Sequence, residues 1–204
     1  MSLIEAEQGQ SEHKRKQEEK KQRFNLRRVE WLIAYMNNEL PTLYQMHISE
    51  KRSDLLDEAQ QFAMGKLIQA GIAGKILLAQ EDDSIKIQDS VRADIPNIIE
   101  ILTQHGIESS TLTKQQKKKI RHIVDDSEHA RVLFAEKNLG LVSLIAGRRR
   151  HLSNTGSVDF DDLVEEGKVG LMIAIDRFDP SMGNMFSTPA TWWIDQPIRS
   201  YLDC

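Results

Sequence analysis

Cysteine, glycine and proline are scarce in this sequence, and each scarcity excludes a class of protein. The single cysteine, Cys204, stands at the last of the 204 positions, so it can form neither a disulfide framework nor a cysteine-based zinc site. Eleven glycines and five prolines are too few for the many tight turns of an all-β fold. The six histidines show no pair spaced as metal ligands on one helix face, and the sequence has no phosphate-binding glycine loop or nucleophile elbow. We therefore expect neither an enzyme nor a bound cofactor or metal.

Long apolar runs and a surplus of positive charge are also missing. No run approaches the roughly 20 apolar residues of a membrane span, and the first residues lack the basic-then-apolar pattern of a secretory signal. The 27 lysines and arginines are balanced by 31 acidic residues, which gives a net charge of −4. This balance excludes a uniformly basic protein of the kind that coats nucleic acid, although it allows a local basic surface. We expect a soluble cytoplasmic protein that does not contact the membrane.

Apolar residues recur at helical spacing along most of the chain, and strand-like alternation is scarce. This pattern predicts an all-α fold, a helical bundle. The predicted elements are a first packed helix from Val29, a helix opened by Ser49 and interrupted at Gly71 and Gly74, a loop or hairpin-like excursion over 80–94, helices over 96–105, 113–123, 127–145 and 159–178, a polar connection from Gly147, and a last helix capped by Ser187 or Thr188 with Pro189 at its first position.

Three segments of the chain differ in composition. Residues 1–28 are rich in charge of both signs and poor in apolar residues, which is typical of a disordered segment or of a solvated helical extension. A nucleic-acid-binding arm is the alternative interpretation of this segment. Residues 29–126 are predicted to form a helical N-terminal domain whose role the sequence does not indicate, and residues 127–204 are predicted to form a third unit.

Three motifs of the last third carry the functional prediction. They are Asn138-Leu-Gly-Leu-Val-Ser-Leu-Ile-Ala146, Asp162-Leu-Val-Glu-Glu-Gly-Lys-Val-Gly-Leu-Met172 and Phe186-Ser-Thr-Pro-Ala-Thr-Trp-Trp-Ile-Asp-Gln196. In this order and spacing they resemble region 2 of bacterial RNA polymerase sigma factors of the housekeeping and stationary-phase type. The resemblance extends over residues 130–202. The first 120 or so residues show no comparably clear match to the family. The resemblance implies a module of three or four helices that acts in transcription initiation.

The predicted 159–178 helix has an apolar stripe on one side and an acidic face on the other. Gly167 and Gly170 have no side chain beyond a hydrogen, so another helix can approach this part of the helix surface closely. The acidic face is typical of a plain solvated helix or of a dock for a basic helical partner, and the residues alone leave both open. The resemblance implies the dock. It identifies the partner as the clamp coiled coil in the largest subunit of core RNA polymerase and assigns to this contact Asp162, Glu165, Glu166 and Lys168.

The last predicted helix carries two adjacent tryptophans, Trp192 and Trp193. Their side chains point about 100° apart, so they cannot both face one core. An exposed indole can stack on an unpaired base, which contributes about 1–3 kcal/mol, but from the residues alone packing in the protein interior is an equal alternative. The resemblance implies that this helix holds flipped-out bases of the single-stranded promoter −10 element. The DNA-facing positions that it assigns are Asn138, Leu141, Phe178, Phe186, Thr188, Trp192, Trp193, Gln196 and Arg199.

Several DNA-facing positions differ from the family pattern, which predicts a weakened DNA contact. Pro189 replaces a usual tyrosine, and Asp195 replaces a usual basic residue with an acid that repels phosphates. Pro197 removes a helical hydrogen bond, so the helix is predicted to kink or end near Gln196 and to displace Arg199. Further departures are Asn184 in place of an aromatic residue, Gly140 in place of a basic one, and Ser181, Met182 and Met185 in a turn where basic residues are common.

Two functional hypotheses follow. The first is a sigma-like transcription initiation factor that binds core RNA polymerase through the acidic helix and engages the −10 element with weakened DNA contact. The alternative is a degenerate sigma fragment that occupies the polymerase clamp as a competitor or regulator without promoter recognition. Because the sequence ends at Cys204, before the part of the family that contacts the −35 element, we expect no bipartite promoter recognition by this chain alone.

Overall fold

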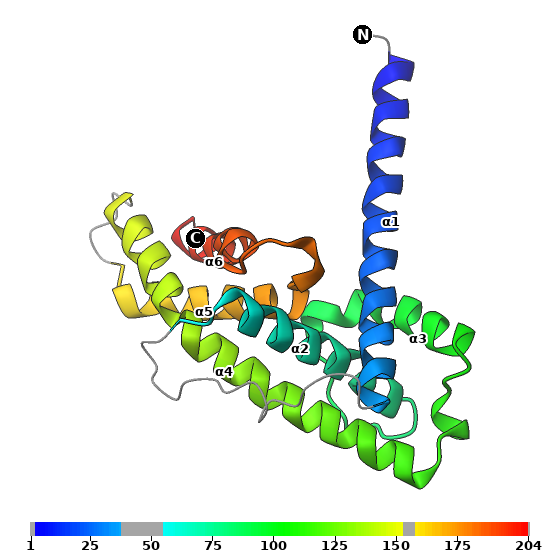
Figure 1. Cartoon of the computed structure of the whole chain (residues 1–204). Helices are drawn as coiled ribbons and strands as arrows, with labels where there is room; N and C mark the ends of the chain where they lie inside the picture. Colours follow the sequence, from blue (N-terminus) through cyan, green and yellow to red (C-terminus); the bar gives the residue numbers. More distant parts are fainter. Residues whose placement is uncertain (1–2, 38–54, 153–157, 204) are drawn as a thin grey trace.

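The computed structural model describes residues 3–37, 55–152 and 158–203, and within these residues there are helices but no strand (Figure 1). This confirms the predicted all-α fold. None of the described helices is long and apolar enough to cross a membrane. The helices are α1 (Leu3–Met36), α2 (Glu58–Leu78), α3 (Ile95–Gln104), α4 (Lys114–Leu152), α5 (Phe160–Arg177) and α6 (Ser187–Leu202), with short 3-10 turns η2 (Asp89–Asp94), η3 (Ser109–Thr111) and η4 (Pro180–Met182).

The last three helices pack against one another, and α5 runs antiparallel to α4 and α6 (Figure 1). At one end of this unit, Phe134 of α4 meets the rings of Phe178 and Phe186, which follow α5 and precede α6. Toward the other end, Arg149 of α4 pairs with Asp195 of α6. α4 and α6 therefore run in the same direction, and α5 returns between them.

α6 runs through Pro197, so of the two predicted outcomes, a kink or an end near Gln196, the end is wrong. The helix continues to Leu202, and Arg199 stays on its exposed side. Proline leaves the carbonyl of Trp193 without its helical N–H partner. That carbonyl points at Gly170 of α5, where an added Cβ would lie only 2.2 Å from the oxygen. Glycine at this position leaves room for the carbonyl, so the neighbouring helix accommodates the proline.

α2 begins at Glu58 and runs through both of its predicted interruptions. Its cap is Asp57, whose carboxylate accepts a hydrogen bond from the Gln60 N–H at 2.7 Å, while the Gln60 side chain accepts one from the Asp57 N–H. The predicted start at Ser49 lies outside the described residues. Gly71 does not interrupt the helix because it is a contact point, where an added Cβ would lie 1.8 Å from Oγ of Ser127. Glycine here lets α2 and α4 approach closely.

The two helices predicted over 113–123 and 127–145 form one continuous helix, α4. It also extends past Gly147, where the sequence predicts a polar connection, to Leu152. Because α2 packs along α4, tertiary contact holds the helix together where the sign of its charge changes. The domain boundary predicted between residues 126 and 127 falls inside α4, and as a division into separately folding units it stays a prediction.

The start of α6 is set by α2 rather than by a local cap. Ser187 is the first helical residue, and neither its side chain nor that of Thr188 caps the helix, contrary to the prediction. Instead, the N–H of Phe186 donates to Oε1 of Gln61 on α2 at 3.0 Å. Pro189 is consequently the third residue of the helix rather than the first, where its missing N–H still costs no helical hydrogen bond.

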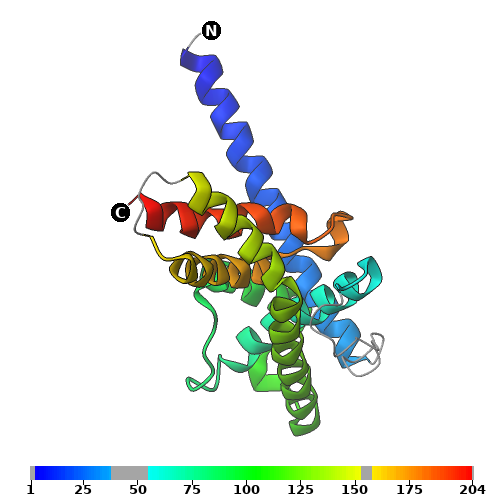
Figure 2. The ribbon, with the colours of Figure 1, turned by 90° about the vertical axis from the view of Figure 1, so that its left-hand side faces the viewer.

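α1 is a single helix, so the described part of the charged segment is helical rather than disordered. Its first turns stand clear of the body in both views (Figures 1 and 2), and residues 10–20 are exposed. Farther along, α1 packs against α2 and α3, where Val29 and Leu32 are fully buried. The helix therefore forms an arm that projects from a packed base.

A buried arginine joins this base to the carboxyl-terminal unit. The guanidinium of Arg28, which has no exposed surface, donates to Gln69 Oε1 at 2.7 Å, Asn25 Oδ1 at 2.9 Å, Asp94 Oδ2 at 3.0 Å and the carbonyl of Asp176 at 2.9 Å. Burial lowers the pKa of Arg28, and the Asp94 carboxylate opposes this shift. Gln69 also donates to carbonyls at the end of α5. These bonds fix α1, η2 and the end of α5 relative to one another.

Candidate functional site

The acidic side chains predicted on one face of α5 lie at the surface. Asp159 caps the helix, and the acids of the first turns lie near the positive end of its dipole, which favours them. Asp162 and Glu165 are exposed, whereas Glu166 and Lys168 are half-buried. The opposite side of the helix packs into the core as predicted, through Leu163, Leu171 and Ala174. We call the surface formed by Asp162, Glu165, Glu166, Lys168 and Val169 the acidic face.

Neighbouring side chains modify the charge of the acidic face. Lys168 Nζ lies 2.6 Å from Glu165 Oε1, and the hydroxyl of Tyr201 on α6 donates to Asp162 Oδ2 at 2.9 Å. This hydrogen bond raises the pKa of Tyr201. Val169 is 54% exposed one turn beyond Glu165, so the face has an apolar patch beside its carboxylates. The sequence reasoning missed Tyr201, for which the only signal was an aromatic residue near the end of the last helix.

The two tryptophans lie together on α6. Trp192 is 53% exposed and Trp193 is half-buried, with ring centres 4.6 Å apart and ring planes at 81°. The guanidinium of Arg177 lies 5.7 Å from the centre of the Trp193 ring, within reach of a cation–π interaction. Thr188 and Gln196 are exposed on the same helix. An exposed indole flanked by polar side chains is an arrangement that can stack on unpaired bases.

Phe178 and Phe186, predicted to face DNA, are core residues instead. They are 4% and 1% exposed, their rings pack edge to face at 5.3 Å, and Phe134 completes the cluster. The turn that contains η4 folds both rings back onto α4, which buries them. A base cannot stack on a buried ring, so we remove both residues from the predicted DNA-facing set. They hold the start of α6 against α4.

Asn138 and Leu141 lie half-buried on α4. The Asn138 amide donates to the carbonyl of Phe134 at 2.8 Å, so it is oriented by its own helix. Leu141 packs against the core, and Gly140 between them is exposed. This stretch of α4 presents an amide and apolar surface where a basic residue is usual in the family.

Asp195 pairs with two arginines. Its carboxylate accepts two hydrogen bonds from Arg149 of α4, to Oδ1 and Oδ2, both at 2.5 Å, and Arg199 Nε lies 3.2 Å from Oδ2. The hydrogen bonds that Arg149 donates to this carboxylate raise the pKa of the Arg149 guanidinium. The carboxylate is therefore compensated inside the protein, and it engages the guanidinium groups of both Arg149 and Arg199. The sequence reasoning missed Arg149, whose only signal was its place in a run of three arginines.

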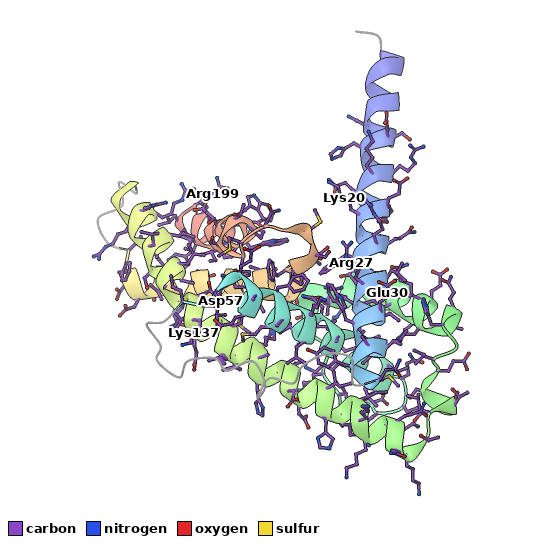
Figure 3. The ribbon with its side chains drawn as sticks, viewed as in Figure 1. Lys20, Arg27, Glu30, Asp57, Lys137 and Arg199 are labelled. Carbon is purple, nitrogen blue, oxygen red and sulfur yellow. The ribbon has the colours of Figure 1, made fainter. Side chains whose placement is uncertain are left out.

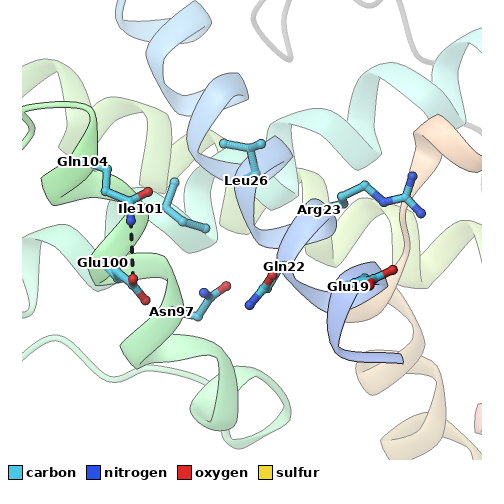
Figure 4. Close-up of a pocket in the computed structure, with 8 residues that line it drawn as sticks. All are labelled: Glu19, Gln22, Arg23, Leu26, Asn97, Glu100, Ile101 and Gln104. Atoms are coloured by element: carbon cyan, nitrogen blue, oxygen red, sulfur yellow. Dashed lines mark hydrogen bonds between the residues drawn. The ribbon is translucent and has the colours of Figure 1, made fainter. Parts of the chain in front are cut away.

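The described residues form neither a metal site nor a reactive centre in the cleft between α1 and α3. Within the described residues, no three side chains that could hold a metal ion come together. A cleft of about 650 Å³ lies between α1 and α3 (Figure 4), and its one internal side-chain hydrogen bond runs from Gln104 to Glu100 at 3.3 Å. Its walls hold no convergent set of reactive groups. They are formed by Glu19, Gln22, Arg23, Leu26, Asn97, Glu100, Ile101 and Gln104.

The helices that bear the acidic face and the tryptophans coincide with a known family. Residues 134–203 match the family model described as Sigma-70 region 2. Residues 134–203 belong to the sigma-70 family as its region 2. They comprise the second half of α4, all of α5 and α6, and the turn between these two helices. This match confirms the resemblance drawn from the three motifs.

Similar curated proteins include three sigma factors. RNA polymerase sigma factor RpoS of Coxiella burnetii is 39% identical over 122 residues, which are 60% of this chain and 33% of that protein. RNA polymerase principal sigma factor HrdD of Streptomyces griseus is 33% identical over 164 residues, 79% of this chain and 40% of that protein. RNA polymerase sigma factor SigA of Lactococcus lactis subsp. cremoris is 49% identical over 74 residues, 36% of this chain and 19% of that protein. The chain thus spans two fifths or less of the length of each.

The longer matches correct one expectation. A match of 164 residues in a chain of 204 must include part of the first 120 residues. The similarity to sigma factors therefore extends upstream of the 130–202 stretch to which the three motifs confine it. Because the match leaves out only about a fifth of this chain, it includes α2 and α3. The buried contacts of Arg28 join the helix before them, α1, to η2 and to the end of α5.

Proposed function

We propose that this chain is a sigma-like transcription initiation factor, which binds core RNA polymerase through the acidic face and engages the single-stranded −10 element through α6. One observation carries the proposal: exposed carboxylates and an exposed indole stand on adjacent helices of a sigma-70 region 2 module. The partner of the acidic face is the clamp coiled coil of the largest polymerase subunit, as the family resemblance implies.

The acidic face supports a protein contact by its chemistry. Glu165 has 71% of its side chain exposed, and Val169 beside it gives the apolar centre that a protein interface needs within a polar rim. Carboxylates around that centre attract a basic helix and fix its orientation. Tyr201 holds Asp162 in place from α6, so the contact surface is partly ordered before a partner arrives.

The polar and aromatic surface of α6 supports a DNA contact. Trp192 presents an open ring to an extruded base, and such stacking contributes about 1–3 kcal/mol for each base. Gln196 lies one turn farther along α6 and can read a base edge. Thr188 offers a hydroxyl near the start of the helix. The sites assigned to DNA in this proposal are therefore Thr188, Trp192, Trp193, Gln196 and Arg199, with Asn138 and Leu141 on α4.

Charge reversal on the acidic face tests the polymerase contact. We expect Glu165→Lys to weaken binding of the chain to core polymerase by about tenfold, because a cation then faces a basic partner. Glu166→Lys should add to this loss. The matched control is Glu136→Lys, which makes the same change at an exposed position of α4 and should bind like the unmodified chain. Equal binding of all variants in a titration of labelled polymerase would refute the assignment of this face.

The alternative function is a polymerase-bound competitor that does not recognise promoters. The pairing of Asp195 with Arg149 and Arg199 favours it, because both arginines are already neutralised by a carboxylate. The two functions differ in one measurable property. The competitor inhibits transcription driven by an intact sigma factor and shows no preference for a −10 sequence, whereas the initiation factor shows that preference.

A further inference from the structure

A second cleft lies between the α1 arm and the turn that joins α5 to α6. It has a volume of about 570 Å³, and its walls come from α1 on one side and from Arg177, Asp179 and Met182 on the other. Figure 3 shows Lys20 and Arg27 extending from α1 on the side of this turn. We call this space the arm cleft. Neither the acidic face nor the tryptophan pair includes it.

Positive charge prevails in the arm cleft once internal pairs are accounted for. Asp94 is held by the buried Arg28 and by Lys21, and Asp179 is paired with Arg27. The remaining acid in its walls is Glu18, and the remaining cations there are Lys20, Arg23 and Arg177. Lys20 and Arg23 form no ion pair with any residue that the structure describes. Cations left without a partner beside a cleft favour an anionic ligand.

Arg177 makes the arm cleft continuous with the tryptophan pair. Its guanidinium lines the cleft, lies 5.7 Å from the Trp193 ring, and is held by a hydrogen bond of 2.5 Å to the carbonyl of Ser90. Phe24 and Met182 add apolar surface to the cleft walls. A strand whose base lies on the tryptophans therefore passes Arg177 and meets cations and apolar side chains beyond it. This combination is typical of grooves that bind single strands.

We propose that the arm cleft binds a single DNA strand that continues past the tryptophan pair, with its phosphates at Lys20, Arg23 and Arg177. The inference rests on the proposed function and extends it to a part of the chain outside region 2. The arm that appears as a solvated extension thereby serves as one wall of a nucleic-acid groove. Since α1 projects on the side of the body on which α6 lies (Figures 1 and 2), the strand need not turn around the molecule.

Oligonucleotides of two lengths test this inference. The full chain is titrated with a labelled −10 non-template oligonucleotide, and with the same oligonucleotide extended by about ten nucleotides at either end, between 0.1 and 1 M salt. We expect one of the two extensions to raise the affinity. Lys20→Gln should then lower the affinity for the extended strand about fivefold at 0.1 M salt and reduce its salt slope by about 0.7. The shorter strand should be unaffected.

Two variants make the outcomes distinct. Arg15→Gln removes the same charge about 140° around α1 from Lys20, at a position that does not line the arm cleft, and should leave affinity unchanged. Trp192→Ala should weaken both strands. Equal affinity for the short and extended strands would overturn the inference, and so would equal effects of Lys20→Gln and Arg15→Gln on the affinity for the extended strand. In either case, a loss of affinity in Trp192→Ala would leave the proposed function intact. Tighter binding of a duplex than of the strand would also overturn the inference, and no binding of either strand would overturn both proposals.

Discussion

Replacing Arg28 with alanine should lower the free energy of unfolding by about 3–5 kcal/mol, the cost of breaking a buried ion pair and removing the guanidinium from its other buried partners. Asp94 is 2% exposed and Gln69 is fully buried, so water cannot replace the lost guanidinium. Urea denaturation followed by circular dichroism measures the change. Because Arg28 also donates to the carbonyl of Asp176, the end of α5 should lose protection from hydrogen exchange together with α1.

An exposed arginine of the same helix provides the control for this prediction. Arg15 pairs with Glu19 at 3.5 Å, but 71% of its side chain is exposed. Arg15→Ala should therefore change the free energy of unfolding by less than about 0.5 kcal/mol. If Arg28→Ala lowered the free energy of unfolding as little as Arg15→Ala, the buried network would not hold α1 to the carboxyl-terminal module.

Asp195→Asn should raise the affinity for a single-stranded −10 oligonucleotide by about 25-fold at 0.1 M salt. The change keeps the shape of the side chain and frees Arg149 and Arg199, and each cation that then binds a phosphate adds about 0.7 to the salt slope. The freed side chains are 30% and 52% exposed, so they remain solvated and the fold should lose little stability. Fluorescence anisotropy across a salt series measures both the affinity and the slope.

A double-mutant cycle separates release of arginines from simple loss of repulsion. Arg149→Gln should change little by itself, because Asp195 already occupies this arginine. In the Asp195→Asn background, Arg149→Gln should lower the affinity for the oligonucleotide about fivefold. If Asp195→Asn leaves DNA affinity unchanged, the arginines are not withheld from DNA by this carboxylate, and the competitor function gains support.

Local periodicity was sufficient to predict that the chain is helical and that the acidic face is exposed. The spacing of Leu163, Leu171 and Ala174 along α5 decides which side is buried, and the carboxylates follow on the other side. The adjacency of Trp192 and Trp193 likewise requires that the two indoles point in different directions, and one of them is exposed. These features depend on residues within a few turns of one another.

Contacts distant in sequence explain what the sequence did not predict. The bond between Arg149 and Asp195 joins residues 46 positions apart, and nothing in either local pattern indicates it. The resemblance assigns Phe178 and Phe186 to DNA, whereas packing against Phe134 of α4 buries both rings. Pro197 disfavours a helix by local rules, but Gly170 on the adjacent helix leaves room for the carbonyl that the proline frees. In each case a partner on another helix decides the outcome.

The most direct measurement follows retention of a −10 oligonucleotide by core polymerase that carries this chain. A labelled non-template oligonucleotide with the −10 sequence and a scrambled one are titrated into the assembled complex. We expect the −10 sequence to bind about tenfold more tightly, with the preference lost in Trp192→Ala and the complex itself lost in Glu165→Lys with Glu166→Lys. Equal binding of the two oligonucleotides, or a complex that forms despite both charge reversals, would contradict a region 2 that joins polymerase to an opened promoter.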